Sequence, residues 1–367
     1  MRSADDRAAL HALLALDSLT PRRLLELSNE CRTARTCLEA VRAGRGASDA
    51  DQSRARALDP KEIAARVSEA GARLVAVGEA EYPAALLDLF DPPAGLFVRG
   101  APLSPLRTGV GIVGARNCSP GGRDVAISLG RALAGAGACV VSGAARGIDA
   151  AAHRGALEGH GSTLAVLGSG IDVFYPSQNR TLIERIATSG TVLSEYPPGT
   201  RAEPFRFPAR NRLVAALSVA VVVVEGAQGS GSMITADHAL DLGREVFAVP
   251  GAVSTALAQV PLALIREGAA LIRGPDDLLG DLGLAAKGMG DAPEGERHSG
   301  PPANLPDANG RRVWDALTFP STADRLAGQT GMALFEVVAS LIRMELRGAV
   351  RQVGGRFERV GGGAEGF

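Results

Sequence analysis

Cysteine, aromatic residues and net charge are all scarce in this chain of 367 residues. The four cysteines form no C-x-x-C pair, which argues against a zinc site and against a disulfide framework. Because the formal net charge is −1, no overall basicity points to nucleic acid, and an anion site requires a local concentration of arginine. No apolar run approaches the ~18 residues of a membrane span, and the first residues, MRSADDRAAL, lack the apolar segment of a signal peptide. We therefore expect a cytoplasmic protein that makes no membrane contact.

Glycine is abundant, with 46 residues, and many of the glycines follow short apolar runs. Four such runs begin with the pattern of a strand buried on both faces, then break at small residues and continue into helix-compatible sequence. Strands that alternate with helices predict an α/β fold with a doubly wound parallel sheet, and we expect the functional site at the carboxyl ends of its strands. The four units are GVGIVGARNCSPGG (109–122), ACVVSGAARGIDAAAH (138–153), TLAVLGSGIDVFYP (163–176) and VAVVVVEGAQGSGSMITA (219–236).

Composition and periodicity divide the chain into four predicted segments. In the first, Thr20 and Pro21 form an expected helix start, whereas residues 42–58 lack apolar periodicity and are interpreted as a linker. The segments are a small helical N-terminal domain with this linker (1–58), the α/β domain (59–280), a flexible linker rich in Gly, Pro and Ala (281–308) and a compact terminal domain (309–367).

The α/β domain is expected to open with a helix from Pro60 to about Ala70 and a short strand at 74–77. The following segment, 81–100, contains too many prolines for the interior of a sheet. We expect it to pack over the first of the four buried strands instead.

The terminal domain has the element order of a winged helix. Its expected recognition helix carries a single cation in its middle, Arg343, although a helix that reads a DNA groove should be more basic. The pattern therefore favours a protein-docking or ancillary role over DNA reading, without excluding the latter. The elements are a helix at 311–317, a second helix begun by a capping box of Ser321 and Asp324, a third helix with an apolar face from Leu334 to Ile342, and a hairpin at 349–360 that turns at Gly354 and Gly355.

Arginine and glycine follow the ends of the predicted strands. Arg116 lies just past the first strand, and Arg146 follows the second in the sequence SGAARG. A run of Gly and Ser at 229–232 precedes a helix expected to start near Met233. Small residues let backbone N–H groups approach an anion, and the N-terminus of a helix favours negative charge. Three such turns at one edge of a sheet predict an anion-binding site.

The densest basic stretch is RAEPFRFPARNRL (201–213), which interleaves Phe205 and Phe207 with four arginines. Cations for phosphates and aromatic faces for bases are what single-stranded nucleic acid binding requires. The alternative is an exposed loop whose phenylalanines enter the core while its arginines face solvent. The arginines are Arg201, Arg206, Arg210 and Arg212, against a single Glu203.

Catalytic patterns are weak. Asp149 and His153 share a helix face, but the acid is placed to cap the helix and the histidine is more typical of a packed residue. His238 has no metal-ligand spacing. Glu195 and Glu225 end strands near the expected site and are the only acid–base candidates, although they could pair with the arginines instead.

A dinucleotide site is also disfavoured. Residues 109–114 match G-x-G-x-x-G, but the match lies inside the apolar run rather than after it. The second strand ends in Ser142 and Gly143, where an NAD site would place an acidic residue.

Several of these motifs, in this order, resemble the DNA-processing protein DprA/Smf family. They are GIVGARNCSPGG, VVSGAARGIDAAAH, TLAVLGSGIDVFYP, VLSEYPPG, FPARNRLVAALS, VVVVEGAQGSGSMITADHALDLGREVFAVPG and LIREGA, and they span roughly residues 81–280. One departure is STALAQVPLALIREGA (254–269), which lacks the asparagine usual before the LI-x-x-GA segment, close to the family's dimer surface.

The resemblance implies an extended Rossmann-like domain, flanked by the helical and winged-helix domains, that binds single-stranded DNA. It also implies a homodimer that protects incoming DNA and loads the RecA recombinase in natural transformation, with no catalysis, metal or cofactor. Two alternatives remain open: a phosphoribohydrolase-like, nucleotide-processing enzyme, and a scaffold for a recombinase with weak DNA affinity. The predicted DNA-binding residues are Gly114, Arg116, Ser142, Gly143, Arg146, Arg206, Arg210, Asn211, Arg212, Gly229, Ser230, Gly231 and Ser232, of which Arg116, Arg146, Arg210 and Arg212 are expected to meet and hold consecutive phosphates.

Overall fold

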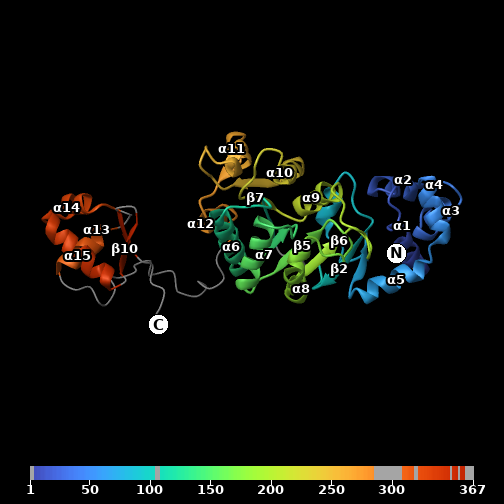
Figure 1. Ribbon diagram of the computed structural model, residues 1–367, viewed down its shortest axis with the longest axis horizontal. Helices are drawn as coiled ribbons and strands as arrows, with labels where there is room; N and C mark the ends of the chain where they lie inside the picture. Colours follow the sequence, from blue (N-terminus) through green and yellow to red (C-terminus); the bar gives the residue numbers. More distant parts are fainter. Residues whose placement is uncertain are drawn as a thin grey trace. The chain divides into compact units, whose positions relative to one another are not determined.

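The computed structural model describes residues 4–103, 108–284, 308–317, 321–347, 349–353 and 356–359. The chain forms two compact units, Met1–Met289 and Gly290–Phe367 (Figure 1). The larger unit contains the helical and α/β segments, and the smaller unit contains the terminal domain.

A nine-stranded sheet forms the centre of the larger unit, in the order β1-β2-β6-β5-β4-β3-β7-β8-β9. The strands from β6 to β9 pair in parallel, whereas β1 and β2 join the β6 edge in antiparallel fashion. The four strands expected from the apolar runs are β3, β4, β5 and β7, so the parallel sheet is confirmed. The bounds are β1 Arg73–Ala76, β2 Gly95–Gly100, β3 Gly109–Val113, β4 Cys139–Ser142, β5 Thr163–Leu167, β6 Thr191–Ser194, β7 Ala220–Val223, β8 Glu245–Ala248 and β9 Ala270–Leu271.

Helices cover both faces of this sheet (Figure 1). Two consecutive residues of β3 show why: Ile112 packs with helices α6 and α7, whereas Val113 belongs to the cluster under α9, α10 and α11. Because successive residues of a strand point to opposite faces of the sheet, a continuous apolar run requires helices on both faces. The bounds are α6 Pro120–Gly135, α7 Ile148–Glu158, α8 Arg180–Ser189, α9 Arg206–Ala216, α10 Gly231–Asp241, α11 Gln259–Arg266 and α12 Pro275–Asp281, with short 3₁₀ turns at Ala84–Asp88, Ser177–Asn179 and Ala256–Ala258.

The order of the strands creates a switch point between β3 and β7. From β3 the chain proceeds through β4 and β5 toward one edge, then returns to the other side of β3 to form β7 and β8. At such a point the loops after neighbouring strands diverge and leave a crevice outside their carboxyl ends.

The segment 81–100 differs from the expectation. Its C-terminal part forms β2, which lies inside the sheet between β1 and β6. The prolines, Pro83, Pro92 and Pro93, all precede the strand, whose own sequence, GLFVRG, contains none. The expectation failed because the proline content of the whole segment was applied to a strand that lacks proline.

Helices form the N-terminal part of the larger unit. Thr20 caps one of them by accepting a hydrogen bond from the backbone N–H of Arg23, as the sequence predicted. The predicted linker 42–58 is wrong for residues 49–57, which form a helix capped by Ser48. That helix has few apolar residues and is held by tertiary contacts, including fully buried Ala55. The bounds are α1 Ala4–Leu13, α2 Pro21–Cys31, α3 Ala34–Arg42, α4 Asp49–Ala57 and α5 Pro60–Glu69.

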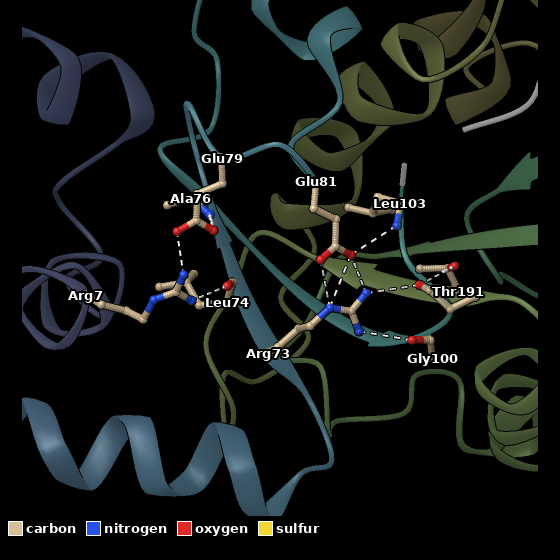
Figure 2. A network of polar contacts seen from close by, with 10 residues as sticks. Arg7, Arg73, Leu74, Ala76, Glu79, Glu81, Gly100, Leu103 and Thr191 are labelled. Atoms are coloured by element: carbon tan, nitrogen blue, oxygen red, sulfur yellow. Dashed lines mark hydrogen bonds and ion pairs between the residues drawn. The ribbon is translucent and has the colours of Figure 1, made fainter. Parts of the chain in front are cut away.

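Polar contacts tie these helices to the edge of the sheet (Figure 2). On α1, Arg7 donates to the carbonyl oxygen of Leu74 at 2.7 Å and pairs with Glu79. On β1, Arg73 forms an ion pair with Glu81. Buried apolar packing and the contacts of Arg7 therefore join the helical segment to the sheet within one unit, and the Arg73–Glu81 pair holds β1 to the segment that follows it.

The smaller unit has the predicted winged-helix elements around Trp314, Val337, Leu341 and Phe357. The cap of its second helix is Thr322, which accepts from the N–H of Arg325, so the predicted capping box at Ser321 and Asp324 is wrong. Ser321 instead exchanges backbone hydrogen bonds with Phe357. The predicted turn at 354–355 and most of the predicted linker, 285–307, lie outside the described residues. The bounds are α13 Ala308–Ala316, α14 Ala323–Thr330, α15 Leu334–Leu346, β10 Val350–Val353 and β11 Arg356–Arg359.

Candidate functional site

Two adjoining cavities open at the switch point, with volumes of about 230 and about 360 Å³. Together we call them the switch-point crevice. Their walls come from the loops that follow β3, β4 and β5 and from the first turns of α9 and α10. The predicted site residues that line the crevice are Gly114, Arg116, Gly143, Arg146, Arg210, Asn211, Ser230, Gly231 and Ser232.

Two exposed arginines stand at the crevice. Arg116 follows β3 and places its guanidinium 5.1 Å from the centre of the Phe207 ring. Arg146 follows β4 and is also exposed. Among the described residues neither forms an ion pair with a carboxylate, so both guanidinium groups remain available to an anion.

Arg210 is also basic but lies beneath the floor of the crevice, 4% exposed. Its guanidinium donates to the carbonyl oxygen of Gly143 at 2.7 Å and to that of Val166. Burial lowers the pKa of Arg210 to about 10, so the group stays charged at neutral pH. Arg210 therefore fixes two strand ends and adds a positive potential from below.

Two glycines at the floor of the crevice lie very close to neighbouring side chains. A Cβ atom at Gly143 would lie 2.4 Å from Nη2 of Arg210, and one at Gly114 would lie 2.7 Å from Cγ1 of Ile148. Both distances are shorter than a normal Cβ contact, so a side chain at either position would displace Arg210 or Ile148. The small residues that the sequence placed after β3 and β4 thus let backbone, helix and guanidinium pack together.

The third wall is the N-terminus of α10. Ser230 is the N-cap and accepts from the N–H of Ser232, so the helix begins at Gly231, two residues earlier than predicted. Asn211 on α9 donates to the carbonyl oxygen of Gly231 at 3.1 Å and holds the turn against α9. Gly229 is outside the lining but has φ +77°, the left-handed conformation that forms the turn. The uncapped N–H groups and the helix dipole face the crevice.

Ser142 is internal, whereas Asp149 lines the crevice and also holds the loop after β4. The hydroxyl of Ser142 is fully buried and donates to the carbonyl oxygen of Ile112 at 2.6 Å, so it does not face the crevice. Asp149 does not cap α7, whose N-cap is Gly147; its carboxylate accepts from the N–H of Gly143 at 3.2 Å. Burial raises the pKa of Asp149, against the opposing charge of Arg210. Asp149 therefore shapes the loop after β4.

Arg212 and Arg206 lie outside the crevice. Arg212 is bound by Glu195 at 2.7 Å and by Asp91 at 3.3 Å, with its side chain only 10% exposed. Arg206 pairs with Asp17 at 2.9 Å. The expectation that the guanidinium groups of Arg116, Arg146, Arg210 and Arg212 meet is therefore wrong for Arg212. Arg210 and Arg212 are two residues apart on helix α9 and so point to opposite sides.

The acid–base candidates are engaged elsewhere. Glu195 pairs with Arg212, as one of the two sequence interpretations proposed, and burial raises its pKa. Glu225 accepts from the N–H of Ser119 at 2.8 Å and from its hydroxyl at 2.5 Å, and so fixes the start of α6. Neither lines the crevice. His153 is a packed residue: burial lowers its pKa to about 3.

Tyr175 is a crevice residue that the sequence interpretation missed. It follows β5, is 48% exposed, and lies with its ring centre 5.2 Å from that of Phe207. The signal was present, because TLAVLGSGIDVFYP was one of the four strand units and its carboxyl end had to reach the same edge of the sheet. The crevice thus combines cations, backbone donors and an aromatic pair.

Within the described ranges no group of three or more His, Cys, Asp or Glu side chains is arranged to hold a metal ion. No helix in that part of the chain has both the length and the apolar character of a membrane span.

Two family models match the chain: DNA recombination-mediator protein A over residues 73–283, and the DprA winged helix domain over residues 297–356. Protein Smf of Synechocystis sp. is 34% identical over 334 residues, which are 82% of this chain and 84% of that protein. The X-ray structure of DNA processing protein A from Streptococcus pneumoniae has a TM-score of 0.66 at 33% identity and covers 75% of this chain and 97% of its own. The DNA processing protein A of Helicobacter pylori, whose structure concerns its single-stranded DNA binding mode, has a TM-score of 0.52 at 31% identity and covers 58% and 97%.

Proposed function

This chain belongs to the DNA recombination-mediator protein A family, also named DprA or Smf, and from that membership we propose that it binds single-stranded DNA, without sequence preference, at the switch-point crevice. The observation that carries the proposal is the convergence of Arg116, Arg146 and the N-terminus of α10 around one crevice. A ligand with several phosphates satisfies all three at once.

Each wall of the crevice suits a different part of a nucleotide. The exposed guanidinium groups of Arg116 and Arg146 fit phosphates, for which arginine offers paired donors. The N–H of Gly231 and the dipole of α10 fit a further phosphate at the start of that helix. Arg210 adds charge from beneath the floor. None of these contacts reads a base edge, which supports binding that is independent of sequence.

The aromatic pair supports a single strand over a duplex. Tyr175 and Phe207 offer ring faces on which an unpaired base can stack, whereas the bases of a duplex are stacked on each other. The neighbouring protein from Helicobacter pylori is described by its single-stranded DNA binding mode, which agrees with this preference.

We extend the proposal to the family's cellular role. The protein acts in the cytoplasm as a homodimer, protects incoming single strands during natural transformation and loads the RecA recombinase on them. It works without catalysis, metal or cofactor. The alternative of a nucleotide-processing enzyme has little support, because its candidate acids, Glu195 and Glu225, hold Arg212 and Ser119 outside the crevice.

The test is a salt series of binding to a fluorescent single-stranded oligonucleotide, with unlabelled duplex as competitor. Three phosphate contacts predict that log K falls with log salt at a slope of about −2 for a single strand. Competition by an equal concentration of duplex, or a slope near zero, contradicts the proposal. Incubation with a panel of nucleotides checks the enzymatic alternative, which requires turnover that Glu225→Gln abolishes.

A further inference from the structure

A second polar cavity, of about 330 Å³, lies between the N-terminal helices and the loop that leads into α9. We call it the interdomain cavity. It shares no lining residue with the switch-point crevice. Its charged lining residues are Asp17, Arg54, Arg66, Arg201, Glu203 and Arg206.

Positive charge predominates in the interdomain cavity, with four guanidinium groups against two carboxylates. One carboxylate, that of Asp17, serves two of the arginines: it lies 2.9 Å from Arg206 and 3.3 Å from Arg54. Arg66 and Arg201 are exposed, and neither forms an ion pair within the described ranges. The cavity therefore carries an excess of cations that no side chain of the described chain neutralises.

Arg206 is the buried part of this lining, 9% exposed. Its guanidinium lies 4.5 Å from the ring centre of Tyr196 and 5.1 Å from that of Phe205, and its Nε has no hydrogen-bond partner. The carboxylate that pairs with it, Asp17, is 63% exposed. Because an exposed carboxylate holds its partner weakly, an entering anion can share or replace it.

The first turn of α9 connects the two cavities. Arg206 faces the interdomain cavity, whereas Phe207 and Arg210 face the switch-point crevice. Arg206 and Arg210 are one helical turn apart, ~6 Å along the axis. The second group of arginines therefore begins about one helical turn from the crevice.

We propose that the interdomain cavity is a second phosphate subsite, through which a single strand leaving the crevice continues onto the N-terminal helices. Arg66 of α5 and Arg201 of the loop each contact one phosphate of the strand, and Arg206 supplies charge from behind. The helical segment is then part of the DNA-binding surface. This inference rests on the proposed function, since it concerns the same ligand.

The experiment compares the full chain with its Arg66→Gln/Arg201→Gln variant. Both side chains are exposed and outside the ion pairs described, so the fold should be unchanged, which thermal unfolding checks. The matched control is Arg154→Gln/Arg185→Gln, which removes the same charge from exposed positions on α7 and α8. The probes are fluorescent oligothymidines of about 6 and about 16 nucleotides.

With the long probe, removal of two phosphate contacts should flatten the salt slope by about 1.4 and weaken binding roughly tenfold at about 0.15 M salt. The affinity gap between the long and short probes should shrink in this variant and not in the control. If slope and gap match those of the control, the inference is overturned.

The outcome for the proposed function is read separately, from Arg116→Gln. If this variant flattens the slope while Arg66→Gln/Arg201→Gln does not, the crevice stands and the second subsite fails. If the unchanged chain does not bind single strands at all, both proposals fail together.

Discussion

The arginines at the crevice and those of the RFPARNR segment differ in what surrounds them. Arg116 and Arg146 follow strand ends and are exposed, and no carboxylate of the described residues pairs with them. Arg206, Arg210 and Arg212 lie on one helix, α9, and all three are buried. Each of these three has partners within the chain. Arg206 pairs with an aspartate, Arg210 donates to two backbone carbonyl groups, and Arg212 pairs with a glutamate and an aspartate.

The exposed arginines are therefore suited to bind an anion from solution, and the buried arginines to hold the surrounding structure in place. A buried guanidinium has already lost its water and depends on the partners that replace it. An exposed one keeps its water until a phosphate displaces it. Substitutions of the exposed arginines should therefore change the salt dependence of DNA binding and leave folding stability unchanged, whereas substitutions of the buried ones should lower folding stability.

The largest effect is expected from Arg212→Met. It leaves the buried carboxylate of Glu195 without its partner, and loss of one member of a buried ion pair costs about 3–5 kcal/mol of unfolding free energy. Urea unfolding at neutral pH measures the loss. A stability equal to that of the unchanged chain would contradict the stabilising role of the Arg212–Glu195 pair.

Two controls test the cause of that loss. Adding Glu195→Gln to Arg212→Met removes the unpaired charge and should restore much of the stability. Burial also raises the pKa of Glu195, so the folded state binds the proton more tightly than the unfolded state. The loss in Arg212→Met should therefore shrink as the pH falls toward the ordinary carboxyl range, and grow as the pH rises.

A smaller loss is expected for Arg210→Met. The carbonyl oxygens of Gly143 and Val166 lose their donor, which costs about 2 kcal/mol if they stay buried and unsatisfied. The DNA salt slope should flatten by about 0.7 as well, because a cation is lost. Arg210→Lys keeps the charge without the paired geometry, so it should restore the slope more fully than the stability. The reverse result would contradict the assignment.

Tyr175→Leu tests the aromatic wall. Loss of one stacking surface should weaken single-strand binding by about 2 kcal/mol, because base stacking on an aromatic ring is worth that order. The salt slope should not change, since no charge is removed. Phe90→Leu is the matched control, because Phe90 is an exposed aromatic residue outside the crevice. Equal affinity in the two variants would remove the stacking role.

The smallest effect on folding is expected for Arg116→Gln/Arg146→Gln. Unfolding free energy should change by less than about 0.5 kcal/mol, as for other exposed substitutions. The DNA salt slope should flatten by about 0.7 for each arginine. If the double variant loses stability instead, the contrast between exposed and buried arginines fails.

Much of the fold was predictable because each element has a local signal. The strands β3, β4, β5 and β7 are short, β-branched and continuously apolar, so burial on both faces followed from the sequence. β2 was missed because the prolines of segment 81–100 lie before the strand and not within it. α4 was missed because its stability comes from contacts with other helices rather than from its own periodicity.

By itself, the sequence determined the alternation of strands and helices, and with it the edge of the sheet where the loops after β3, β4 and β7 meet. It did so because apolar periodicity and glycine at strand ends are local properties of the chain. Only the tertiary structure decided which arginines of α9 are bound internally and which cations stay exposed. A helix of 3.6 residues per turn places Arg210 and Arg212 on opposite sides, whereas Arg206 lies one turn before Arg210 and meets Asp17. Whether a guanidinium meets a carboxylate or solvent there depends on residues far away in the chain, such as Asp17 and Glu195.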